Sequence, residues 1–175
     1  MVKQTAGRDA LGNFAPKFAE NTDSELAAFA ATLMFPVGES NDAYAQYFGG
    51  KSWLAPLTAE QVPTANVTFE PGCRNNWHVH NADKGGGQML ICVGGRGYYQ
   101  EWGQPAQEML PGDVVNIPTG VKHWHGAAPD SWFAHLAFTV PGENCSNEWL
   151  PPGFAADQRK IAPPWSRFPT KTTAN

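Results

Sequence analysis

Residues 66–93 read NVTFEPGCRNNWHVHNADKGGGQMLICV, and this stretch decides the fold class. It contains three short runs rich in β-branched and aromatic residues, and glycine or proline lies between them, as is typical of β-strands joined by tight turns. The pattern continues to about residue 140. Seven or eight short antiparallel strands at this spacing predict an all-β fold, either a sandwich or a double-sheet barrel. The expected strands lie at 66–69, 77–80, 88–93, 97–102, 106–109, 113–117, 122–126 and 132–140.

The histidines of these strands indicate a metal site. The chain has five histidines, of which four form two His-x-His pairs, at 78/80 and 123/125, and the fifth is His135. Side chains at i and i+2 of a strand project from one face, so each pair directs two imidazoles into the same volume. Neutral imidazole binds Zn, Mn, Fe, Co, Ni or Cu, and a three-histidine site with one oxygen donor leaves a coordination position for substrate. We therefore expect His78, His80 and His123 to bind one divalent metal ion.

The first 61 residues predict a helical extension. Thr22 and Glu25 have the spacing of a capping box before an apolar stripe that ends near Leu33. A second helix is expected at 41–48, and Thr58 with Gln61 could cap one more helical turn. We expect these helices to pack against the barrel or a partner subunit in a homodimer. Residues 143–175 form a C-terminal extension.

Composition narrows the class of function. The 175 residues suit one domain, and 18 glycines and 15 prolines with 16% charged residues favour short strands over helices. A net charge of −4 and scattered basic residues argue against a nucleic-acid partner. The absence of a long apolar run argues against a membrane span or a secretory signal, so a cytoplasmic location is expected. Cys73, Cys92 and Cys145 form no C-x-x-C pair and predict reduced thiols rather than a zinc site.

Two groups of motif residues resemble the two conserved motifs of the cupin family, over residues 62–142. The resemblance implies the cupin double-stranded β-helix, a jelly-roll barrel. It also implies four metal ligands, namely His78, His80, His123 and the residue at the glutamate position of the first motif. The first group is Gly72, His78-Val79-His80, Gln88 and Gly95, and the second is Gly112, Pro118, Gly120 and His123.

The glutamate position of the motif holds Gln88 here. Seven residues separate it from His80, which is more than the family spacing, but counting back from Gly95 restores that spacing at Gln88. We interpret the inserted residues 83–87 as a loop that bulges from the barrel mouth and could gate it, with Asp83 as the alternative donor. A neutral amide leaves the ion with one more unit of positive charge than a carboxylate would, which favours Lewis-acid chemistry.

The glutamine also resembles that of the small manganese-dependent cupins that act as hydroxynitrile lyases. The run 122–129 and the later His135-Leu136-Ala137 match those proteins as well. The resemblance implies manganese as the first choice of metal. Residues 4–20 are similar to the opening of carboxymuconolactone decarboxylase domains, but the catalytic region of such a domain has no counterpart, so we assign that fragment to packing or dimerisation.

The acid–base residues are expected on the last long strand. His135 and Thr139 share one face of the strand and would lie beside the metal with His125. Histidine exchanges protons near neutral pH, so His125 and His135 are the candidate proton carriers. Trp77 and Trp124 alternate with the ligand histidines and should face away from the metal. Polar wall residues that could bind substrate are Asn66, Thr68, Asn76 and Gln100, with Arg74.

Three functions fit this pattern. The first is a metal-dependent enzyme that acts on a small hydroxylated, carbonyl or lactone substrate, in its most specific form a hydroxynitrile-lyase-like C–C lyase. The second is an iron- or copper-dependent oxygenase, since three histidines with open positions also hold those metals. The third is a non-catalytic protein that senses or binds a small molecule. The cupin fold hosts many chemistries, so only the site can separate them.

Overall fold

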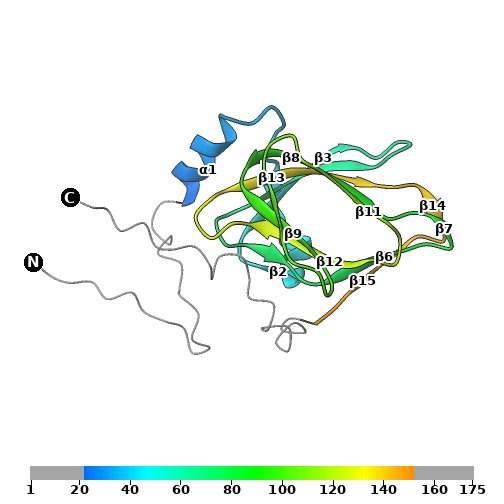
Figure 1. Ribbon diagram of the computed structural model, residues 1–175. Helices are drawn as coiled ribbons and strands as arrows, with labels where there is room; N and C mark the ends of the chain where they lie inside the picture. The colour runs from blue at the N-terminus through cyan, green and yellow to red at the C-terminus, as the bar shows by residue number, and fades with distance from the viewer. Residues whose placement is uncertain (1–21, 152–175) are drawn as a thin grey trace, which may run out of the picture.

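Two facing β-sheets form a barrel in the computed structural model, which describes residues 22–151 (Figure 1). One sheet has the strand order β1-β3-β4-β13-β8-β11. The other has the order β10-β9-β12-β5-β2, with β6 paired to β12 and β15 paired to β6. This mostly β architecture confirms the expected fold class. The predictions for residues 4–20 and for the end of the chain lie outside the described residues.

Most strands are short and are joined by turns. Each pairing between them is antiparallel, as expected. The elements are α1 (Thr22–Ala30), β1 (Glu39–Ser40), a 3-10 helix (Asp42–Tyr47), β2 (Phe48–Gly49), β3 (Ser52–Thr58), β4 (Thr64–Phe69), β5 (Arg74–Asn75), β6 (His78–Asn81), β7 (Lys84–Gly85), β8 (Gln88–Gly95), β9 (Gly97–Glu101), β10 (Gln107–Met109), β11 (Val114–Ile117), β12 (Lys122–Ala127), β13 (Phe133–Thr139), β14 (Gly142–Glu143) and β15 (Ser146–Trp149).

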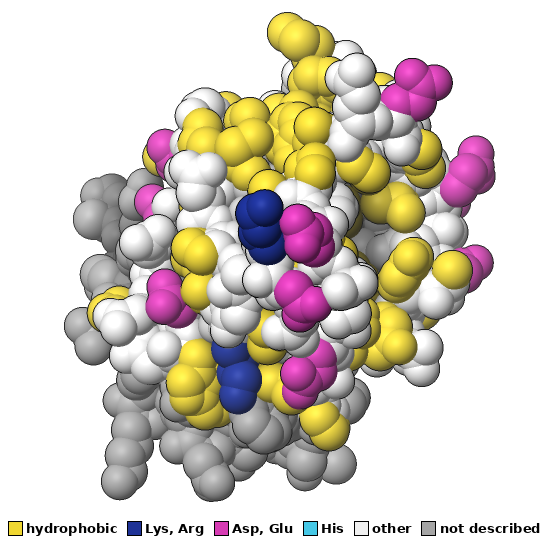
Figure 2. Space-filling view, turned by 90° about the vertical axis from the view of Figure 1, so that its right-hand side faces the viewer, with side chains coloured by type: hydrophobic (Ala, Val, Ile, Leu, Met, Phe, Trp, Pro, Cys, Tyr) yellow, Lys and Arg dark blue, Asp and Glu magenta, His cyan; other side chains and the backbone are white. Residues whose placement is uncertain are grey.

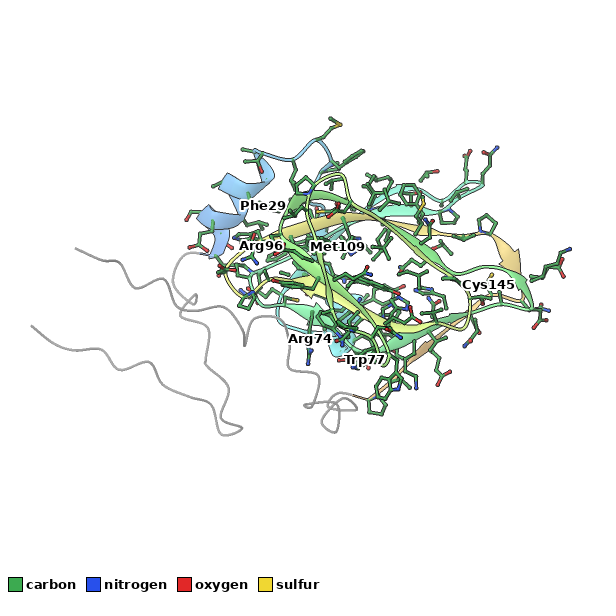
Figure 3. The ribbon with its side chains drawn as sticks, viewed as in Figure 1. Phe29, Arg74, Trp77, Arg96, Met109 and Cys145 are labelled. Carbon is green, nitrogen blue, oxygen red and sulfur yellow. The ribbon has the colours of Figure 1, made fainter. Side chains whose placement is uncertain are left out.

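The core lies between the two sheets. Val67 and Phe69 of one sheet share a buried cluster with Tyr99 and Ala127 of the other, so these side chains point inward. A second cluster, around Trp77, lies on the outer face of the second sheet. Figure 3 shows Trp77 on that outer side and Met109 between the sheets. The alternation of side chains along each strand thus separates an inner and an outer set of residues.

The glycines of the inserted loop set the position of Gln88. Gly85, Gly86 and Gly87 all have positive φ, at +64°, +73° and +94°, a region that residues with a side chain rarely adopt. A Cβ at Gly87 would lie 2.3 Å from the Ile117 carbonyl oxygen, so only glycine fits there. The loop does not hang free, because β7 pairs with β14 in a two-stranded sheet at one end of the barrel (Figure 1).

The N-terminal region differs from the expected helical extension. The helices predicted at 22–33 and 41–48 correspond to α1 and to a 3-10 helix, but the turn capped by Thr58 and Gln61 is wrong. Thr58 instead ends β3, and Gln61 has a positive φ of 46° in the turn that follows. Pro56 obscured this strand, since proline lacks an N–H for the ladder and is tolerated there beside a bulge. Both β3 and β15 pair with barrel strands, so the sheets extend beyond residues 62–142.

α1 covers the outer face of the first sheet near β8 and β13. Phe29 stacks on Trp132 with ring centroids 5.8 Å apart. A Cβ at Gly94 would lie 2.2 Å from the Leu33 side chain, so the segment after the helix contacts the sheet directly. This segment buries the outer face of β4 as well, where the Asn66 side chain donates a hydrogen bond to the Pro36 carbonyl over 2.8 Å.

Candidate active site

The five histidines converge inside the barrel. β6 and β12 are neighbours, and their register pairs His78 directly with His123, so the two His-x-His pairs face the same volume. The His78 and His123 ring centroids lie 4.2 Å apart, and the His80 ring lies 5.2 Å from His78 and 5.5 Å from His123. All five side chains are buried. On the face that Figure 2 shows, no histidine of the described residues reaches the surface.

Backbone carbonyl groups fix the tautomers of two of these rings. His78 Nδ1 donates to the Asn76 carbonyl and His123 Nδ1 donates to the Val121 carbonyl, each over 2.9 Å. Because a carbonyl only accepts, each Nδ1 carries the proton and each Nε2 keeps a lone pair. The buried His80 Nε2 has no hydrogen-bond partner among the described residues. The three rings therefore hold a nitrogen lone pair ready for a metal ion, and such orientation of ligand histidines is common in metal sites.

Gln88 lies beside this group, at the start of β8. Its Oε1 is 3.3 Å from His123 Nε2. With the lone pair on Nε2, two acceptors face each other at this distance, and a cation between them would remove the conflict. The Nε2 or Nδ1 atoms of His78, His123 and His125 lie within 4.8 Å of one another, so in this structure His125, and not His80, completes the tightest group of three nitrogen donors among residues 22–151. The residues present therefore fit a metal ion bound by imidazole nitrogens and one amide oxygen.

Burial keeps these histidines neutral. It lowers the pKa of His80, and it lowers that of His78 well below 6.5, with the charge of His123 as a second cause. Burial also lowers the pKa of His123 to about 4. Neutral imidazole is the form that binds a metal, so the site is ready for one at neutral pH. Asp83, the alternative donor, is exposed, and its carboxylate accepts a hydrogen bond from Asn144, so the structure does not bring it to the histidines.

A second pair of histidines adjoins the first group deeper in the barrel. His135 Nε2 lies 3.0 Å from His125 Nδ1, so the two rings share one proton in a hydrogen bond. Burial lowers the pKa of His135 to about 4, and burial with the neighbouring His135 lowers the pKa of His125 well below its usual range, so both rings are uncharged. The His125 ring is 5.4 Å from His78 and 6.0 Å from His123. This arrangement places a proton acceptor beside the candidate metal position, as predicted from the strand pattern.

Comparison with known proteins gives two informative relatives, while no family model matches the chain. One is named (R)-mandelonitrile lyase, from Granulicella tundricola, and is 40% identical over 110 residues, which cover 61% of this chain and 81% of the relative. The other is the crystal structure of a cupin-like protein from Thermotoga maritima, at 35% identity and a TM-score of 0.59, covering 73% of this chain and 96% of that one. The chain belongs to the cupin family. This cupin thus has the fold that its sequence motifs implied.

Three of the predicted site residues face away from the histidines of the cupin barrel. Asn66 and Thr68 alternate with the inward-facing Val67 and Phe69, so they lie on the outer face of the sheet, beneath the N-terminal segment. Gln100 also faces outward, where it accepts a hydrogen bond from the Trp124 indole over 2.8 Å. The assignment of these three residues to substrate binding was wrong, because the sequence did not give the phase of β4 and β9.

The remaining two predicted residues lie at the margin of the site. Asn76 precedes β6 and supplies the carbonyl that orients His78, while its side chain reaches toward the Gln46 carbonyl at 3.5 Å. Thr139 is exposed at the end of β13, directly opposite Gln88 in the register. Direct partners project from the same face, so Thr139 lies at the barrel rim beside Gln88, on the face of β13 that also carries His135 but farther along the strand. Arg74 packs over the outer Trp124 ring at 5.2 Å.

Several residues that contact the histidines were not predicted from the sequence. Asn75 accepts a hydrogen bond from the His125 backbone N–H, and Phe69 packs against the His125 and His135 rings at 5.9 and 5.5 Å. Trp149 of β15 stacks on His78 with centroids 4.5 Å apart. The pairing of β15 with β6 is a long-range contact that no local sequence motif predicts. Asn75 lies three residues before His78, and this proximity in the sequence could have suggested it.

Trp149 is expected to tune the metal affinity of this cupin. It is held between the Tyr47 ring, at 4.4 Å, and the His78 ring, so its removal frees the imidazole to rotate. Changes around metal ligands typically cost 10- to 100-fold in affinity, and for Trp149→Ala we expect about 10-fold weaker metal binding. Trp149→Phe keeps a stacking ring and should retain most of the affinity. Metal titration of the apoprotein measures both, and equal affinity of the alanine variant and wild type would contradict the positioning role.

Acid is expected to destabilise the metal-free protein. The pKa values of His123 and His135 are about 4 in the fold but near 6.5 in an unfolded chain. Between these two pKa values the unfolded state binds more protons than the folded state. The free energy of unfolding is therefore highest above about pH 6.5 and decreases as the pH falls toward 4. Chemical denaturation at a series of pH values measures this loss. His135→Gln, which cannot titrate, should show a smaller decline, and an identical decline would contradict the burial argument.

Some expectations from the sequence are not tested by the structure. No helix of residues 22–151 has the length and apolar character needed to cross a membrane. The homodimer, the cytoplasmic location and the absence of a nucleic-acid partner stay predictions. The thiols of Cys73 and Cys92 are buried, which raises the pKa of Cys92 to about 11 and that of Cys73 further, whereas Cys145 is exposed.

Proposed function

We propose that this cupin is a metal-dependent lyase that cleaves a cyanohydrin into an aldehyde and hydrogen cyanide. The observation that carries the proposal is the juxtaposition of two groups in one buried space. One group is the neutral donor set of His78, His80, His123 and Gln88, and the other is the His125–His135 pair. The 40% identical relative named (R)-mandelonitrile lyase supports the same reaction.

The donor set suits a Lewis-acid role. Three neutral imidazoles and an amide contribute no negative charge, so a bound divalent ion, with manganese as our first choice, would keep its full charge and polarise a substrate oxygen. His78, His80, His123 and Gln88 would hold it. The same donor types accept other divalent metals, including iron, zinc, nickel, cobalt and copper, so identity depends on geometry and supply.

The His125–His135 pair provides the proton chemistry. One of the rings removes the hydroxyl proton of the cyanohydrin, and the oxygen electrons form the aldehyde C=O as the C–CN bond breaks. The bonding pair leaves as cyanide, which takes the proton back from the imidazolium and departs as HCN. Neutral, buried rings suit this cycle because they accept a proton only transiently, and the hydrogen bond between them orients the acceptor nitrogen.

The surroundings of the pair keep water away. His135 has no exposed surface and His125 is buried, and the Phe69 ring packs against both. The side-chain amide of Asn75 lies against the His125 ring, and its oxygen accepts the His125 backbone N–H over 3.0 Å. A dry and fixed pair strengthens its hydrogen bonds to substrate and keeps water from taking the proton that the imidazolium returns to cyanide.

Metal reconstitution followed by a substrate panel tests the proposal. The stripped protein is loaded with one divalent metal at a time and assayed for aldehyde release from mandelonitrile, lactone hydrolysis and oxygen uptake. We expect aldehyde release with manganese and no substrate-dependent oxygen uptake. Oxygen uptake with iron or copper alone would instead support an oxygenase. Tight binding of small molecules with no turnover under any metal would support a sensor.

A further inference from the structure

A cavity opens beside the β9–β10 hairpin. Its volume is about 390 Å³, within the range of small-molecule sites, roughly 300–1,000 Å³. The strand residues Tyr99 and Glu101 come from β9, and the others come from the turn and the start of β10. The lining residues are Tyr99, Glu101, Gln104, Pro105, Ala106 and Gln107.

This cavity adjoins the histidine site. Tyr99 lines it, and the Tyr99 ring is also 5.8 Å from the His123 ring, so this side chain borders both the cavity and the histidine group. The register between β9 and β12 pairs Glu101 directly with His123, and Tyr99 with His125. Direct partners in an antiparallel pair project from the same face, so Glu101 stands on the histidine side of the sheet. A substrate held by its oxygen at the histidines would reach the cavity past the Tyr99 side chain.

The cavity offers a hydrogen-bond acceptor that has no protein partner among the described residues. The Glu101 carboxylate has no hydrogen-bond or ion-pair partner among residues 22–151, and an ionised carboxylate only accepts. Burial and the charge of Glu101 raise the pKa of Tyr99 to about 12, so that hydroxyl stays protonated. A substrate whose side chain carries a hydrogen-bond donor would pair with the Glu101 carboxylate. A substrate without a donor would leave that carboxylate hydrogen-bonded to water.

We propose that this cavity is a subsite for the side chain of the substrate, and that Glu101 selects side chains that carry a hydrogen-bond donor, such as a phenolic hydroxyl. The expected substrate preference in catalysis rests on the proposed lyase function, whereas the expected binding preference of the cavity does not. Because Glu101 is exposed and water competes for it, the preference is moderate, about fivefold to tenfold for a hydroxylated over an unsubstituted aromatic ring.

Substrate comparison is the kinetic test. The ratio of kcat/KM for 4-hydroxymandelonitrile over that for mandelonitrile is measured for wild type, Glu101→Ala and Glu101→Gln. We expect Glu101→Ala to lower this ratio at least fivefold and Glu101→Gln, which keeps an acceptor oxygen, to lower it less. Glu60→Ala is the matched control, an exposed glutamate in the β3–β4 turn, and should leave the ratio unchanged. An unchanged ratio in Glu101→Ala would overturn the subsite.

A binding experiment separates this inference from the proposed reaction. Calorimetry on the metal-loaded protein compares 4-hydroxybenzaldehyde with benzaldehyde and with 4-methoxybenzaldehyde, which has the added oxygen but no donor. Preferential binding of the hydroxyl compound that is lost in Glu101→Ala supports the subsite even if no cyanohydrin is cleaved. Equal binding of all three aldehydes overturns the subsite even if cleavage is fast. Melting temperatures of the variants identify any loss through misfolding.

Discussion

His123→Gln is expected to abolish tight metal binding and to reduce cyanohydrin cleavage by more than about 100-fold. His123 is central to the donor set, because its ring lies within 6 Å of the His78, His80 and His125 rings and its Nε2 faces Gln88. Removal of its Nε2 leaves an incomplete site in which the remaining donors bind the ion weakly. The glutamine side chain fills part of the volume, so the effect on the free energy of unfolding is kept small.

Metal content and activity measured on the same sample decide this prediction. Metal analysis after dialysis should give close to one equivalent for wild type and almost none for His123→Gln. Lys122→Ala, at the neighbouring position on β12, is the control and should keep its metal. Full metal content with full activity in His123→Gln would show that the ion, if any, lies elsewhere.

His135→Gln is expected to lower kcat by about 10²- to 10⁴-fold, the usual contribution of a general acid–base group, while the metal content stays at the wild-type value. His135 has no exposed surface, its Nε2 is hydrogen-bonded to His125, and it is outside the proposed donor set of His78, His80, His123 and Gln88. Its loss therefore removes proton transfer without removing a ligand.

The split between metal content and rate is the diagnostic result here. A variant that is merely unfolded would lose both, and a variant at an unimportant position would lose neither. Deuterated water should slow the wild-type enzyme more than His135→Gln. The reason is that the variant lacks the histidine-assisted proton transfer, which is the step that deuterium slows. Wild-type kcat in a fully metallated His135→Gln would exclude the pair from the reaction.

The histidine spacing was sufficient to predict the centre of the site. Side chains at i and i+2 share a face of a strand, and β6 and β12 pair in the structure so that both His-x-His segments meet. Trp77 and Trp124 lie in the outer cluster, as the same alternation predicted. The counting that placed Gln88 at the motif position also agrees with its proximity to His123. These inferences needed only local periodicity.

The walls of the site could not be predicted in the same way. The polar residues Asn66 and Gln100 looked equally able to face inward, because a strand with buried residues on both faces has no polar side to mark its phase. The structure places Tyr99 and Glu101, the neighbours of Gln100, on the histidine side instead. A shift of one residue exchanges the two faces of a strand, so an error of one position changes the whole wall.

The contact that β15 makes with the site could not be predicted from the sequence either. Trp149 reaches His78 because β15 pairs with β6, across about 70 residues of chain. Pairing between such distant segments depends on the closed barrel rather than on local propensity. The sequence indicated only an extension at residues 143–175, yet β15 within it helps to build the site.

The most direct test of the central claim is a manganese titration of the stripped protein with aldehyde release from mandelonitrile as the readout. The account predicts no cleavage above the uncatalysed rate without metal, a linear rise in rate up to one equivalent, and a plateau beyond it. His123→Gln should stay at the baseline throughout the titration. Cleavage at the full rate by protein whose metal content has been verified as negligible would contradict the account.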